Sequence, residues 1–329
     1  MTTAVLDAPA ASAAQSVAAR MKPVSRSADT LFRWLCLGMA VGVLALVVLV
    51  GWQLWSGAQS AIHKFGVGFL TRSAWDPVQG EFGALPFIYG TLVSSLLGLA
   101  IATPLAVGTA IFLTELAPNW LRQPIAFLTE MLAAIPSVIL GLWAIFIMLP
   151  LLPRYLFPFL KKTLGFLPLF QGPTYSAYSM IAAAIIIAIM ILPIITSVSR
   201  EILRSVPDLQ REAAYGLGAT RWEVTRIAVL SYAKKGIFGA MILGLGRALG
   251  ETMAVTMVIG NTPKIAASLF QPGYTLASVI ANEFAEATTD DYRNALIAVG
   301  LVLFGVTVVI NLLARLLLKF GNTQTGAVH

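Results

Sequence analysis

The sequence predicts an all-α integral membrane protein with six transmembrane helices, from its composition, its apolar stretches and the placement of its basic residues. Of the 329 residues, 58% are hydrophobic and 11% are charged, whereas a soluble domain is about 45–50% apolar and about 25% charged. A soluble core of this length could not bury so much apolar surface, so long stretches must face lipid or other spans.

Six stretches have the length that a span requires, about 20 helical residues for a hydrocarbon core about 30 Å thick. They are Leu31–Trp55, Pro86–Leu116, Ile125–Leu149, Ala177–Val198, Gly236–Gly260 and Ala295–Leu318. Together they predict one transmembrane domain over residues 30–320. The first stretch is too long for the apolar region of a signal peptide, which is about 7–15 residues, so we expect it to remain as a span.

The two ends of the chain are predicted to be tails on the cytoplasmic side. Residues 1–29 are rich in Ala, Ser and Thr and have no apolar period, which predicts disorder; residues 321–329 form the second tail. With the N-terminus in the cytoplasm, most of the 22 Lys and Arg residues fall on the cytoplasmic side, as the positive-inside rule requires. The external segment 151–176 is rich in aromatic residues and is either an interface anchor or part of a docking surface.

Several function classes are disfavoured by what the sequence lacks. One cysteine, Cys36, and two histidines, His63 and His329, cannot build an intrachain disulfide or a Cys/His metal cluster, so no metal site is predicted. Nucleic acid is not an expected partner, because the orientation rule uses most of the net charge of +7. The chain has no Gly-x-x-x-x-Gly-Lys-Ser/Thr phosphate loop, so we predict that it is not an enzyme and binds no cofactor itself.

A charged pair lies in the fifth predicted span. Arg247 is near the midpoint of Gly236–Gly260 and Glu251 follows one helical turn later, so the two share a face and can pair. Each ionised side chain at a helix centre costs roughly 2.5–3.5 kcal/mol, so this face must point into protein or a water-filled cavity. The guanidinium fork suits phosphate or another tetrahedral oxyanion, and Glu251 can orient it or accept a proton-bearing phosphate oxygen. The pair is therefore part of an anion pathway or a buried ion pair that fixes helix packing.

Other residues of the spans and outer loop have weaker assignments. Pro104 and Pro136 interrupt the second and third spans, and such breaks either line a transport route or occur in ordinary spans. Glu130 is favoured as an interface residue. Two small-xxx-small pairs in the fifth span predict close helix packing; they are Ala240 with Gly244 and Gly246 with Gly250. An acidic group on the outer loop is either a solvated face or a partner-docking site; its members are Glu283, Glu286, Asp290 and Asp291.

The longest cytoplasmic connection covers about residues 199–235. Pro207 and Asp208 predict a helix start. Gly218 follows this helix and permits a tight turn, and Trp222 begins a second amphipathic stretch. We expect two short helices outside the membrane, which either dock into a groove of a cytoplasmic partner or form a solvated loop.

This loop carries a motif that resembles a known family. Glu212, Ala213 and Ala214, followed after three residues by Gly218, resemble the EAA motif of ABC importer permeases. In that family the loop is the coupling helix that docks on the ATPase subunit, which implies the same role for these four residues. The pattern usually continues to Ile-x-Leu-Pro; Ala228-Val-Leu-Ser231 keeps only the leucine, so the exit of the loop departs from it.

Three other stretches resemble the C-type permeases of phosphate-specific (Pst) ABC transporters. They are Gly246-RALGETMAVTMVIG-Asn261, Ala134-IPSVILGLW-Ala144 and Ala281-NEFAE-Ala287. The likeness implies a type I ABC importer permease fold, and it implies that Arg247 and Glu251 are the charged pair of the phosphate pathway. Sulfate and molybdate permeases have a related Arg-Ala-Leu-Gly-Glu stretch, so another oxyanion stays an alternative. A stand-alone channel or secondary carrier is a less favoured alternative, and a membrane scaffold or sensor is a third.

The resemblance also implies partners and a location. A permease of this kind works with a second homologous permease, an ATPase subunit dimer that binds ATP and Mg, and an extracytoplasmic phosphate-binding protein. It lies in the lipid bilayer of the bacterial cytoplasmic (inner) membrane. The implied mechanism is alternating access, in which closure of the ATPase pushes on the loop around Glu212–Gly218 and the helices rock around Arg247.

Overall fold

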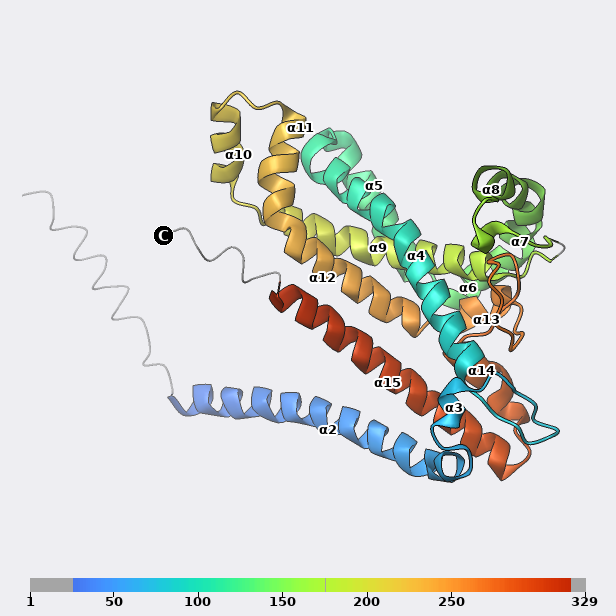
Figure 1. Cartoon of the computed structure of the whole chain (residues 1–329). Helices are drawn as coiled ribbons and strands as arrows, with labels where there is room; N and C mark the ends of the chain where they lie inside the picture. Colours follow the sequence, from blue (N-terminus) through green and yellow to red (C-terminus); the bar gives the residue numbers. More distant parts are fainter. Residues whose placement is uncertain (1–25, 175, 321–329) are drawn as a thin grey trace, which may run out of the picture. The chain divides into compact units, whose positions relative to one another are not determined.

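The computed structural model describes residues 26–174 and 176–320, and these residues form helices and loops with no β-strand (Figure 1). The predicted tails fall largely on residues 1–25 and 321–329, which lie outside the described residues. Helix α2 (Arg26–Phe65) begins at Arg26, so residues 26–29, which we assigned to the tail, are helical.

Within the part of the chain that the structure describes, six helical segments are long and apolar enough to cross a membrane, which confirms the predicted number of spans. Four of them contain or largely overlap the predicted first, second, fourth and sixth stretches, and two differ as described below. The six segments are Asp29–Phe65, Leu85–Leu116, Ser137–Leu164, Met180–Arg204, Arg221–Leu249 and Asp290–Leu318.

The chain divides into two compact units at residue 53. The first contains most of α2, which is apolar on all sides, as expected for a span in contact with lipid or with other spans. The second, from Leu54 onward, contains the remaining elements. These are α3 (Gly68–Thr71), α4 (Leu85–Ile111), η1 (Phe112–Leu116), α5 (Asn119–Ala134), α6 (Ser137–Trp143), η2 (Ala144–Met148), α7 (Leu149–Leu151), η3 (Leu152–Leu156), α8 (Phe157–Leu164), η4 (Pro168–Phe170), α9 (Met180–Arg204), α10 (Asp208–Gly216), α11 (Arg221–Glu223), η5 (Val224–Val229), α12 (Leu230–Leu249), α13 (Met253–Ile259), α14 (Leu276–Glu283), η6 (Phe284–Glu286) and α15 (Asp290–Phe320).

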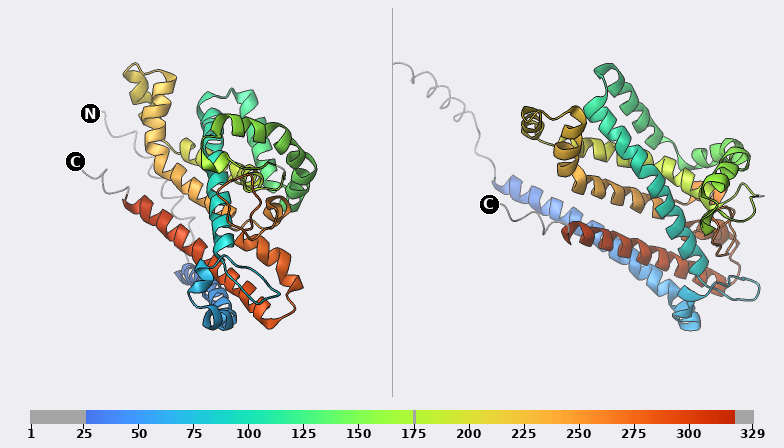
Figure 2. Two further views of the ribbon diagram at one scale, coloured as in Figure 1. Left: turned by 45° about the vertical axis from the view of Figure 1, so that its right-hand side comes forward. Right: turned by 45° about the horizontal axis from the view of Figure 1, so that its top comes forward.

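Helices α4, α9 and α12 pack against one another and form the centre of the second unit (Figure 2). Small residues of α4 and α12 lie against isoleucines of α9. A Cβ atom added at Gly98 would come within 2.7 Å of Ile187, and one at Gly244 within 2.8 Å of Ile195. Such close approach is how helices associate where water supplies no driving force. Gly244 of the predicted packing pair makes this close contact and Ala240 is fully buried, which confirms the pair. The other predicted pair is wrong, since a Cβ atom added at Gly246 or Gly250 would meet no atom of another helix closer than 3.9 Å.

Pro136 ends the helix that we expected to cross as the third span. Helix α5 stops at Ala134, and Ile135 is extended with ψ of 125°, as is usual for a residue before proline. A new helical run starts at Ser137 and continues through α6 to α8. The predicted span Ile125–Leu149 is therefore wrong, and the segment able to cross is Ser137–Leu164.

Gly250 ends the fifth span earlier than predicted. One continuous helical run leads from Arg221 through η5 and α12 to Leu249, after a capping box between Thr220 and Glu223. The predicted span Gly236–Gly260 is wrong, because the chain leaves the helical path at Gly250 and resumes only with α13. The second amphipathic stretch of the cytoplasmic loop is thus the start of this span and not a separate short helix.

Candidate functional site

Arg247 lies in the last turn of α12, at a break between two helices. It does not lie mid-way along a continuous helix, as we predicted, because Gly250 terminates α12. Glu251 follows in the connection to α13, and its Oε1 accepts a hydrogen bond from the Ala254 N–H at 3.4 Å. A carboxylate is favoured near the start of a helix, where backbone N–H groups lack partners, so Glu251 suits its place before α13.

The predicted pairing of Arg247 with Glu251 is confirmed in spite of the break. The Nη2 atom of Arg247 lies 3.7 Å from Oε2 of Glu251. The arginine side chain is 50% exposed and the glutamate side chain only 5% exposed. The two charges therefore form a polar site with a buried carboxylate behind a guanidinium that faces outward from this subunit.

Two of the motifs singled out in the sequence meet behind this site. Helix α6, from the IPSVILGLW stretch, packs against α13, from the GETMAVTMVIG stretch. Gly141 permits the contact, because a Cβ atom there would come within 2.5 Å of the Met257 sulfur and 3.2 Å of the Ala254 Cα. The helix that follows Glu251 is thus held directly against the helix that follows Pro136.

The EAA-like residues lie on and after α10. Glu212, Ala213 and Ala214 belong to this helix, which starts after Pro207 as predicted. Gly218 lies in the turn that follows, with a left-handed φ of 80° that favours glycine. No residue of α10 is buried. Large apolar side chains stand exposed on this helix and on the turn and helix that follow it; they are Leu209, Tyr215, Leu217 and Trp222.

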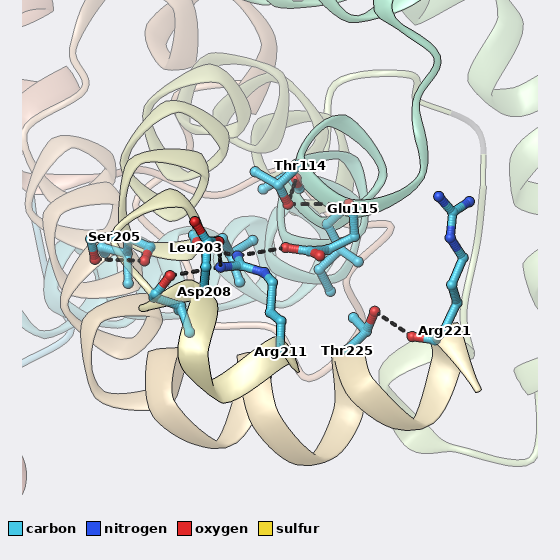
Figure 3. Close-up of polar contacts among 12 residues, drawn as sticks. Thr114, Glu115, Leu203, Ser205, Asp208, Arg211, Arg221 and Thr225 are labelled. Atoms are coloured by element: carbon cyan, nitrogen blue, oxygen red, sulfur yellow. Dashed lines mark hydrogen bonds and ion pairs between the residues drawn. The ribbon is translucent and has the colours of Figure 1, made fainter. Parts of the chain in front are cut away.

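Arg211 connects α10 to two other elements, an arrangement that the sequence analysis missed (Figure 3). Its Nη2 atom donates to Oε1 of Glu115 in η1 at 3.0 Å and to the Leu203 carbonyl at the end of α9 at 3.0 Å. Its Nη1 atom donates to the Val206 carbonyl at 2.6 Å and to Oδ1 of Asp208 at 3.2 Å. Two features of the sequence could have indicated this contact. Glu115 is a lone acid at the end of the predicted second span, and Arg211 is a basic residue next to the EAA-like motif.

A second ion pair joins helices at the same end of the molecule. Arg200 Nη2 lies 2.8 Å from Oε1 of Glu130, which links α9 to α5. Glu130, which we favour as an interface residue, is 58% exposed on its side chain. Among the described residues, neither member of this pair forms a hydrogen bond or ion pair with α10.

Acidic residues of the outer loop have structural partners. Glu283 Oε2 accepts hydrogen bonds from Trp75 Nε1 at 2.8 Å and from the Tyr292 hydroxyl at 2.7 Å, and Asp291 pairs with Lys64. Burial, with the negative charge of Glu283 nearby, raises the pKa of the Tyr274 hydroxyl far above its usual value. Part of the acidic group therefore fastens the 66–84 connection, α14 and α15 to one another.

The chain matches a family model and a group of curated proteins. The model of the inner membrane component of binding-protein-dependent transport systems matches residues 102–320. Three relatives carry the name phosphate transport system permease protein PstC. That of Mesorhizobium japonicum is 46% identical over 303 residues, 91% of this chain and 92% of its own. The relative from Xylella fastidiosa strain 9a5c is 46% identical over 91% of this chain and 93% of its own. The relative from Haemophilus influenzae is 44% identical over 88% of this chain and 93% of its own.

Two solved structures share the fold at low sequence identity. A bacterial alginate ABC transporter in complex with its alginate-bound periplasmic protein has a TM-score of 0.56 at 18% identity, covering 87% of this chain and 94% of that one. An inward-facing MetNI methionine ABC transporter has a TM-score of 0.52 at 15% identity, covering 75% of this chain and 98% of that one. The chain belongs to the family of inner membrane components of binding-protein-dependent transport systems, and it has the type I fold of ABC importer permeases that the resemblance to Pst permeases implied.

Proposed function

We propose that this chain is the permease subunit of an ATP-driven phosphate importer and forms half of its translocation pathway. Relatives at 44–46% identity over about nine-tenths of the chain are named phosphate transport system permeases. These names favour phosphate over the sulfate and molybdate alternatives. Hydrolysis of ATP belongs to a separate subunit, since the chain has no phosphate loop of its own.

The observation that carries the proposal is the half-exposed guanidinium of Arg247 at a helix break. If this face met lipid, the charge would cost at least roughly 2.5–3.5 kcal/mol, so a water-filled cavity or another subunit covers it. The 3.7 Å separation from Glu251 is longer than a good hydrogen bond of 2.7–3.2 Å. The donors of the fork therefore stay available for a passing anion, while the nearly buried carboxylate orients them.

The exposed surface of α10 supports a second part of the proposal. An apolar surface such as that of Leu209, Tyr215, Leu217 and Trp222 is the kind that docks on another protein. In the proposed assembly α10 contacts an ATPase dimer, which holds ATP and Mg, and a second permease completes the pathway. A phosphate-binding protein delivers the anion on the outer side of the inner membrane, and both termini are cytoplasmic.

Transport by the purified complex tests the proposal. The chain is isolated with its co-purifying subunits, reconstituted in liposomes and supplied with the phosphate-binding protein. We expect ATP hydrolysis to rise with phosphate and not with sulfate, and Arg247→Ala to abolish uptake in an assembled complex. Normal uptake by Arg247→Ala contradicts the role of the arginine. Stimulation by sulfate instead of phosphate contradicts the substrate, and phosphate movement by the chain alone contradicts the division of labour.

A further inference from the structure

A side-chain contact joins α10 to η1, the segment that continues the central helix α4, in addition to the backbone connections of α10. We propose that the ion pair between Arg211 and Glu115, which we call the Arg211 joint, carries movements of α10 to α4 during transport. The inference rests on the proposed docking of an ATPase on α10 and adds the route by which that docking acts on the transmembrane core. Arg211 is in this sense a positioning residue.

The first support is the shallow packing of α10, which lies against η5. None of its nine residues is buried. Arg211 reaches from α10 past the end of α9, where it binds the carbonyls of Leu203 and Val206, to the carboxylate of Glu115. These carbonyls lie at and just beyond the end of a helix, where the backbone leaves such groups without partners. Arg211 therefore unites α10, α9 and η1 through one guanidinium.

The second support is the burial of both charges in the joint. The side chains of Arg211 and Glu115 are 18% and 14% exposed, far less than the exposed carboxylate of Asp208. Separating a largely buried pair leaves an unpaired charge, which is strongly unfavourable. The pair is therefore expected to move together, so that a displacement of α10 displaces η1 with it.

The third support is the way α4 is fastened at its other end. The Thr91 hydroxyl oxygen accepts a hydrogen bond from the Leu276 N–H at 2.9 Å, where α14 begins. Gly90 lies directly against the Tyr274 carbonyl, with no room for a side chain. Pro104 lies within α4 without ending it. A displacement of η1 is therefore transmitted along one helix to the loop that starts α14, at the outer end.

The test removes the joint from the Glu115 side, because Glu115→Ala leaves the bonds of Arg211 to the α9 end intact. The whole complex is purified, reconstituted and assayed for ATP hydrolysis and for uptake of radiolabelled phosphate. We expect the ATPase subunit to co-purify and basal hydrolysis to stay within about twofold. Phosphate taken up per ATP should fall about tenfold in Glu115→Ala and about threefold in Glu115→Gln, as for interacting residues that act as a unit.

Glu130→Ala is the matched control, because it breaks another inter-helix ion pair at the same end without touching α10. It should leave uptake per ATP within about twofold of the unmodified complex. Unchanged uptake in Glu115→Ala, an equal loss in Glu130→Ala, or loss of the ATPase subunit from the Glu115→Gln complex would each overturn the joint. Failure of the proposed function looks different, since the unmodified complex would then lack phosphate-stimulated hydrolysis.

Discussion

At the scale of single residues, the shape of the Arg247 side chain is expected to matter as much as its charge. Arg247→Lys keeps a cation but replaces a planar fork by a compact ammonium, which lacks two parallel donors matched to two phosphate oxygens. We predict a loss of about tenfold in uptake rate for Arg247→Lys, since charge-assisted bidentate bonds are among the stronger ones. Uptake kinetics measure this, and a lysine variant as fast as the unmodified complex would refute bidentate binding.

Packing at two glycines of α4 provides a second prediction at this scale. A Cβ atom at Gly90 would overlap the backbone carbonyl of Tyr274, which cannot move aside without shifting the loop. Gly90→Ala should therefore destabilise the chain by about 1–3 kcal/mol or more. Gly108→Ala is the control in the same helix, with nothing within 4 Å of the added atom. Thermal unfolding of both purified variants measures this loss of stability. Equal stability of Gly90→Ala and Gly108→Ala would refute the close contact at Gly90.

At the scale of elements, α10 should be separable from the transport pathway. Glu212→Lys reverses an exposed charge on α10 without removing a contact that holds this helix in the structure. We predict that the variant chain folds and inserts normally but loses the ATPase subunit, or hydrolyses ATP without uptake. Co-purification and uptake assays measure the two outcomes. Normal ATPase binding together with normal uptake would exclude Glu212 from coupling.

Periodicity and composition predict the number of spanning segments but not where two of them break. At Pro136 the interruption was visible in the sequence, yet apolar residues continue on both sides, so hydropathy alone merges α5 with the following run. Apolar residues also continue past Gly250, so hydropathy alone did not show that α12 ends there. A glycine inside an apolar run is tolerated in many spans, and only contacts such as α13 against α6 fix the break.

The candidate site was predictable to the extent that it lies within a short stretch of sequence. Arg247 and Glu251 are neighbours along the chain, so their pairing followed from spacing. Arg211 and Glu115 are 96 positions apart. No spacing rule relates residues of two distant segments, so this joint depends on the packing that brings η1 beside α9, whose end lies just before α10 in the chain. The pairing of two residues so far apart could therefore not be predicted from the sequence.

At the scale of the whole molecule, the distribution of basic residues predicts the orientation in the membrane. The positive-inside rule puts the connection that contains α10 in the cytoplasm and the 66–84 connection outside. Val78 and Leu217 provide matched probes, since each is 90% exposed. We predict that an impermeant thiol reagent added to intact cells labels Val78→Cys and not Leu217→Cys, both in a Cys36→Ala background. Opening the cells should make Leu217→Cys reactive. Labelling of Leu217→Cys from outside would invert the topology, and α10 would then lie on the wrong side to meet an ATPase.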